Sequence, residues 1–149
     1  MQVSAAIQAF LNHRRQRRCQ PSTIEQYEYQ LDYLWLAWRK REGYQDELAV
    51  VNVDEIARYF DYLEHEHVNH TTRAVGLSPA TRDSAWRVLR TFWRYCARRK
   101  WLILDQVDLF QDDEVLARPR VDHRMRPILE DDQLEALLQA TVTLESEEE

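Results

Sequence analysis

The chain has 149 residues, which is the size of one ordinary domain, and 44% of them are hydrophobic, enough for a core and against wholesale disorder. The formal net charge is −6, and two glycines with four prolines are too few for the frequent turns of a β-sandwich or β-barrel. No apolar run has membrane-spanning length, and the N-terminal charge follows the apolar part, the reverse of a signal peptide. We therefore expect a helical cytoplasmic protein with no membrane partner.

Two helices are predicted in the first 41 residues. Apolar residues recur at helical spacing over residues 4–18, which predicts the first helix. The second covers residues 22–41 and is expected to begin with a capping box, in which Ser22 is the N-cap residue and Glu25 stands three positions later. Its apolar stripe consists of Ile24, Tyr27, Leu31, Leu34 and Trp38.

Two further helices have their own start signals. The third is predicted to begin at Asn52, with the acidic Glu55 at the third helical position, and to continue through Leu63. The fourth and longest is predicted to begin with Ser78 as its N-cap and Pro79 at its first position, where a missing N–H is not needed. It is expected to run to about residue 100.

The last third of the chain has a different composition. Residues 105–128 lose helical periodicity and contain two prolines, so we interpret them as an interdomain-type linker. Residues 129–149 hold a short predicted helix followed by an acidic end, and residues 1–104 form the predicted helical domain. The charge follows this division, because residues 1–100 carry a net +4 and residues 101–149 a net −10.

The fourth predicted helix separates into an apolar side and a basic side. Its expected core residues are Ala85, Leu89, Phe92 and Cys96, flanked by Trp86 and Trp93. Roughly opposite lie Arg87, Arg90, Arg94 and Arg98. These arginines lack the interleaved glutamates that usually neutralise a solvent-facing helix through i,i+4 pairs. A solvated face, a nucleic-acid contact and a dock for an acidic partner all remain open from this pattern.

Five segments occur in a characteristic order. They are the opening helix, a second helix with Ser22, Thr23, Ile24 and Tyr27 at its start, "VNVDEIARYFDYL", "LSPATRDSAWRVLRTFWRYCARRKW" and "RPILEDDQLEALLQA". Over residues 3–140 this order resembles the N-terminal core-binding (SAM-like) domain of tyrosine recombinases, the phage integrase family, followed by the segment that opens their catalytic domain. The chain departs from the family at Leu104, Asp105 and Gln106, where Asn-Pro is usual.

The resemblance implies a fold, a partner and a set of contacts. The fold would be an all-α, four-helix core-binding bundle with a C-terminal linker and a short extra helix. The partner would be double-stranded DNA at a recombination site, joined by other recombinase protomers, with no cofactor, metal or small-molecule substrate. The DNA-binding residues that the resemblance nominates, together with the linker arginines, are Ser22, Thr23, Gln26, Thr81, Arg82, Arg87, Arg90, Arg94, Arg118 and Arg120. Plain helix capping is the competing explanation for Ser22.

Catalysis is not expected of this chain. The family cleaves DNA with a tyrosine of its catalytic domain, whereas the last tyrosine here is Tyr95, inside the fourth predicted helix. The chain is accordingly expected to be an excised piece or a truncated gene product that binds DNA without cutting it. The alternative is a protein–protein module or truncated regulator that joins or inhibits a recombinase assembly. The acidic end folding back on the arginines is a third hypothesis.

Two other groups of side chains in the sequence could carry metal or redox chemistry. His65, His67 and His70 are close in sequence, but a solvated loop cluster explains them better than a metal site, because no acidic or cysteine ligand is convincingly placed beside them. Cys19 and Cys96 lack metal-ligand spacing and are expected to be free thiols in a reducing compartment.

Overall fold

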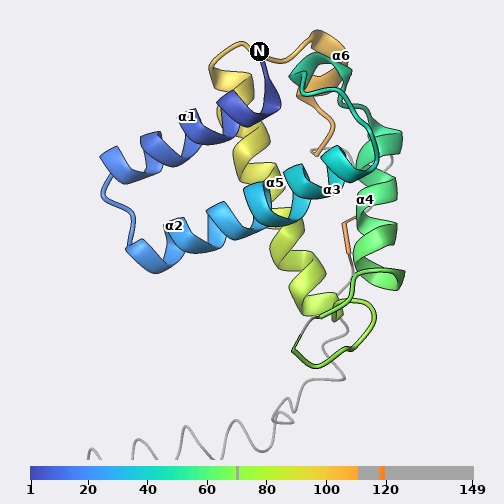
Figure 1. The fold of residues 1–149 in the computed structure, drawn as a ribbon. Helices are drawn as coiled ribbons and strands as arrows, with labels where there is room; N and C mark the ends of the chain where they lie inside the picture. The colour runs from blue at the N-terminus through green and yellow to red at the C-terminus, as the bar shows by residue number, and fades with distance from the viewer. Residues whose placement is uncertain (70, 111–117, 120–149) are drawn as a thin grey trace, which may run out of the picture.

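A computed structural model describes residues 1–69, 71–110 and 118–119 of the chain, and Figure 1 shows its arrangement. These residues are mostly helical, which confirms the prediction of an all-α protein, and they contain no strand, only an isolated antiparallel bridge between Val68 and Val75. The elements are α1 (Val3–Gln16), α2 (Pro21–Glu28), the π-helical η1 (Tyr29–Leu36), α3 (Ala37–Arg41), the 3-10 turn η2 (Leu48–Val50), α4 (Val53–His65), α5 (Pro79–Arg98) and α6 (Leu104–Val107).

Helix α1 and the segment α2–η1–α3 lie side by side and cross α5, while α4 lies along another side of α5 (Figure 1). The predicted second helix exists as this continuous segment, with wide π turns in its middle. Its predicted capping box is wrong. The helix begins at Pro21, with Gln20 in the N-cap position, two residues before Ser22, and no side-chain cap. Proline favours the first helical position because its fixed φ suits a helix and its missing N–H is not needed there.

The caps predicted for the other two helices are confirmed. The Asn52 side chain accepts a hydrogen bond from the Glu55 backbone N–H at 2.9 Å, and Ser78 Oγ accepts one from the Thr81 backbone N–H at 3.3 Å. Pro79 is the first residue of α5. Each cap satisfies one of the N–H groups that have no partner inside the helix, so both helix starts are determined locally.

Aromatic side chains join the helices into one core around α5. Phe92 lies 5.6 Å from the Phe10 ring of α1 and 5.9 Å from the Trp35 ring of η1. On the α4 side, the Phe60 and Trp86 rings lie 5.7 Å apart. The predicted core face of α5 is confirmed by the burial of Ala85, Leu89, Phe92 and Cys96, with Trp86 and Trp93. Because one side of α5 meets α1, η1 and α4, its remaining side is free to carry the arginines.

A buried ion pair connects α3 to α4. Arg39 donates two hydrogen bonds of 2.9 Å to the Glu55 carboxylate, and both side chains are 1% exposed. The Arg39 guanidinium also donates to the Gln45 carbonyl and lies 5.6 Å from the Trp35 ring. Burial raises the pKa of Glu55, and the hydrogen bonds from Arg39 act in the opposite direction. Glu55 therefore serves as the anchor of Arg39 rather than as a reciprocal cap of α4.

Residues 104–110 pack on the helical domain, although sequence analysis placed residues 105–110 in the linker. Gln106 is 3% exposed, and its side-chain amide donates to the carbonyls of Leu48 and Val51 at 2.9 and 2.7 Å. The Trp93 indole N–H donates to the Gln106 carbonyl at 2.7 Å, and the Phe110 ring lies 5.0 Å from the Trp86 ring. These contacts join residues that are far apart in the sequence, so hydrophobic periodicity within the segment could not predict them.

Candidate nucleic-acid interface

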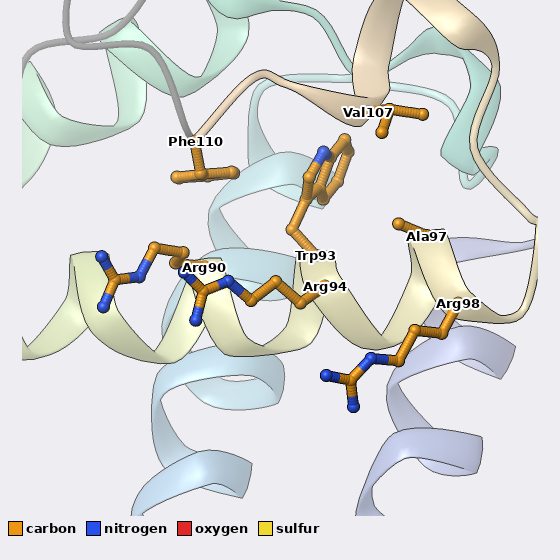
Figure 2. Close-up of a pocket in the computed structure, with 7 residues that line it drawn as sticks. All are labelled: Arg90, Trp93, Arg94, Ala97, Arg98, Val107 and Phe110. Carbon is orange, nitrogen blue, oxygen red and sulfur yellow. The ribbon is translucent and has the colours of Figure 1, made fainter.

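The predicted basic side of α5 faces solvent. Arg87 has a 57% exposed side chain, Arg94 and Arg98 are exposed, and Arg90 is half-buried. Figure 2 shows the side chains of Arg90, Arg94 and Arg98 following one another along the helix. We call Arg87, Arg90, Arg94 and Arg98 the α5 arginine row. No described acidic side chain forms an ion pair with Arg94 or Arg98, so this end of the row retains its positive charge.

One side of the α5 arginine row borders a pocket of about 270 Å³. Arg90, Arg94 and Arg98 supply its charge, and its apolar lining comes from Trp93, Ala97, Val107 and Phe110. Trp93 points from α5 toward the segment that carries Val107 and Phe110 (Figure 2). Burial and the nearby Arg94 lower the pKa of Arg90, which remains a cation at neutral pH. The arrangement combines guanidinium groups with an apolar surface, as anion-binding protein surfaces do.

Asp83, the acidic residue of α5, reduces the positive charge at the start of the α5 arginine row. Arg118 donates to its two carboxylate oxygens at 2.7 and 3.2 Å, and Arg87 Nε lies 3.3 Å from the same carboxylate. The hydrogen bond from Arg118 is the main reason that the pKa of Asp83 is lowered. The structure therefore brings two predicted DNA-binding arginines together at one carboxylate, which partly neutralises both.

The two predicted contacts in the first turn of α5 have structural partners. Arg82 Nη1 lies 3.3 Å from the Glu64 carboxylate of α4, and Arg82 Nε donates to the Leu77 carbonyl at 3.3 Å. The Thr81 hydroxyl lies 2.9 Å from Ser78 Oγ and is part of the helix cap. Thr81 is nonetheless exposed, whereas only 16% of the Arg82 side chain is. Arg82 is thus mainly a link between α4 and α5.

The predicted contacts at the start of α2 lie apart from the pockets beside the α5 arginine row. Ser22 and Gln26 are exposed and Thr23 is half-buried, and none of the three lines those pockets. Ser22 does not cap its helix, so the capping explanation for this residue is wrong. Pro21 has no N–H, and the N–H groups of Thr23 and Ile24 donate to the Gln20 carbonyl, so the Ser22 hydroxyl and N–H are the groups that this end of α2 offers to an anion. Arg120 lies outside the described residues.

The end of α1 contributes basic residues to this surface that were not among the predicted contacts. A second pocket of about 290 Å³ is also lined by Arg94 and Arg98, and Arg14 of α1 and its C-cap residue Arg17 line it from the other helix. The basic sequence "HRRQRR" at the end of α1 is visible in the chain, but it lies some eighty residues before the end of α5. Only the packing of α1 across α5 shows that their arginines share a surface.

The histidines and cysteines do not form a second reactive site among the described residues. His65 Nε2 lies 3.7 Å from both Asp61 and Glu64, the His67 ring packs against Tyr62, and His70 lies outside the described residues. No described group of three or more His, Cys, Asp or Glu side chains is arranged to hold a metal ion. Cys19 and Cys96 are free, and burial raises the pKa of the Cys96 thiol to about 12, which makes it unreactive.

Comparison with known proteins gives no relative for this arrangement. No family model, no curated protein and no solved structure matches the chain. Within the part of the chain that the structure describes, no helix combines the length and the apolar character needed to cross a membrane.

Proposed function

We propose that the chain is a DNA-binding module that binds duplex DNA through the α5 arginine row without cleaving it. The observation that carries the proposal is the row itself, in which Arg94 and Arg98 project from a rigid helix with no described acidic partner. Guanidinium groups match phosphate oxygens and guanine edges, and a helix whose other side packs into the core holds them at fixed spacing. The sequence resemblance supports the more specific proposal, a SAM-like core-binding domain of a tyrosine recombinase.

Arg87, Arg90 and Arg94 form the centre of the proposed binding surface. Arg118 lies at its edge, where its guanidinium donates a hydrogen bond to the Asp83 carboxylate that also pairs with Arg87. Thr81 at the start of α5, together with Ser22, Thr23 and Gln26 at the start of α2, supplies hydroxyl and amide groups for further backbone contacts. Phosphate contacts of this kind position a protein on DNA, whereas the sequence of the site is read by a smaller number of base contacts.

Fluorescence anisotropy with a labelled duplex tests the proposal. If four to six phosphates are contacted, a plot of log affinity against log salt concentration should have a slope of about −4 to −5. The variant R87Q/R90Q/R94Q should lose about tenfold or more in affinity and have a slope shallower by up to about 3. Circular dichroism should show the same helix content for variant and wild type.

A matched variant controls for charge alone. K40Q/R41Q/R58Q also removes three exposed cations, but from α3 and α4, and none of the three lines the pockets beside the α5 arginine row. It should keep most of the wild-type affinity. Equal losses in the two triple variants would show non-specific attraction, and absence of binding in low salt would refute the proposed function.

Association with another protein is the second candidate function. An open groove of about 940 Å³ lies beside η1, and Tyr29 and Tyr33 line it with 50% and 64% exposure. Exposed tyrosines are enriched in protein interfaces. Light scattering after size exclusion, without DNA, should show a dimer that the variant Y29S/Y33S converts to a monomer if this function is correct. A monomeric wild type at high protein concentration would count against self-association.

A further inference from the structure

The pocket between α1 and α5 is lined by cations from two helices. Its ionisable lining comprises His13, Arg14 and the C-cap residue Arg17 at the end of α1, with Arg94, Arg98 and Arg99 at the end of α5. The volume of about 290 Å³ is ample for one phosphate group with its water. None of the described residues that line the pocket is acidic. The pocket is therefore a concave, positively charged site rather than a network of internal ion pairs.

Helix dipoles account for only a small part of this clustering. Both α1 and α5 end near the pocket, and basic side chains are favoured at helix C-termini. Each helix end carries about half a negative charge, so two ends supply about one charge against five guanidinium groups. The uncompensated charge is several units, and it requires either water and counterions or a bound anion.

Two polar atoms at the pocket also lack partners. His13 Nδ1 and Arg14 Nε are buried and have no hydrogen-bond partner among the described residues. The Tyr95 ring packs 5.1 Å from the His13 ring and holds it in place. The pKa of His13 is lowered first by burial and then by the positive charge of Arg14, Arg17, Arg99 and Arg98.

We propose that this α1–α5 pocket binds one phosphate group of the DNA backbone, so that α1 extends the contact made by the α5 arginine row. The inference rests on the proposed function, because Arg94 and Arg98 border both the row's own pocket and this one. Two guanidinium groups from different helices can grip one phosphate with charge-assisted hydrogen bonds. The bound phosphate also compensates the charge that the two helix ends leave uncompensated.

The pocket is tested first with inorganic phosphate alone. Resonances of the His13 imidazole are followed by NMR during a pH titration, with phosphate or with chloride at the same ionic strength. Phosphate should raise the pKa of His13 in a saturable way, because a bound anion offsets the arginines that lower it. The effect should disappear in R14Q/R17Q and persist in R15Q/R18Q, which removes two exposed arginines of the same chain segment that do not line the pocket. R17Q alone serves if loss of Arg14, which packs on Phe10, unfolds the double variant.

Duplex DNA provides the second arm. R14Q/R17Q should bind DNA with a log–log salt slope shallower by about 1, whereas R15Q/R18Q should keep the wild-type slope. If phosphate leaves the His13 resonances unchanged and both double variants have the same slope, the pocket proposal is wrong and binding by the α5 arginine row stands. If phosphate binds but the wild type shows no DNA binding in low salt, the proposed function is wrong and the pocket is a site for a free phosphate anion.

Discussion

The arginines of α3 and α4 differ from those of α1 and α5 in what surrounds them. Arg39 is buried against Glu55, Arg41 donates to the Tyr62 hydroxyl at 2.8 Å, and Arg58 donates to the Tyr44 hydroxyl at 3.3 Å. On α5, Arg94 and Arg98 project beside two pockets without a described acidic partner. Arginines of the first region have hydrogen-bond partners elsewhere in the fold, whereas Arg94 and Arg98 are left open to a ligand. The comparison predicts that the buried Arg39 matters for stability, whereas Arg94 and Arg98 matter for binding.

The largest effect on stability is expected at the buried ion pair. R39A should lower the free energy of unfolding by about 3–5 kcal/mol, because it leaves the Glu55 carboxylate buried without its partner. Urea denaturation followed by circular dichroism measures the loss. R41Q, two residues further along α3 and exposed, should change the free energy by less than about 1 kcal/mol.

The double variant R39M/E55L separates charge burial from packing. Replacing both partners with apolar side chains of similar size is often neutral or stabilising, so it should recover most of the stability lost in R39A. If R39A proved as stable as R41Q, the structural role assigned to Arg39 would be wrong, and burial would not distinguish it from the exposed arginines.

An intermediate effect is expected where residues 104–110 join the helices. Q106L should destabilise the protein by about 1–3 kcal/mol, because the carbonyls of Leu48 and Val51 lose their donor while the volume stays similar. Thermal unfolding measures this loss. D105N, an exposed change on the same turn, should leave the melting temperature nearly unchanged. A loss no greater than that of D105N would mean that the segment adds little to the domain.

Local signals in the sequence predicted the helices better than the contacts between them. The all-α class, the caps at Asn52 and Ser78 and the apolar face of α5 follow from neighbouring residues, and the structure confirms them. The predicted N-cap of α2 was wrong by two residues, because Pro21 takes the first helical position and makes Gln20 the N-cap instead of Ser22. Each of these features is decided within about one turn of helix.

Contacts between distant segments explain what the sequence left out. Gln106 bonds to carbonyls more than fifty residues away, and no periodicity marks such a residue. The α5 arginine row was visible as a pattern, but the same pattern could not show that Arg82 is held by Glu64 or that Arg118 pairs with Asp83. Nor could it show that α1 adds Arg14 and Arg17 to the basic surface. Which arginines are free to bind a ligand therefore depends on how the helices pack, which the local sequence pattern does not specify.

The smallest effect is expected at Asp83, where a carboxylate lies within the binding region. D83N should lower the free energy of unfolding at pH 7 by about 1 kcal/mol or less, since Arg118 is 43% exposed and solvent screens the pair. The folded protein has a lowered pKa at Asp83, so the ion pair contributes stability above the ordinary aspartate value of 3.8. That contribution is lost as the pH falls through the folded pKa. The difference between wild type and D83N should therefore shrink below pH 4, as urea denaturation at several pH values can measure.

D83N should also bind DNA more tightly, because Arg87 and Arg118 then meet phosphate without a competing carboxylate. Weaker DNA binding by a fully folded D83N would show instead that Asp83 holds these arginines in their binding positions.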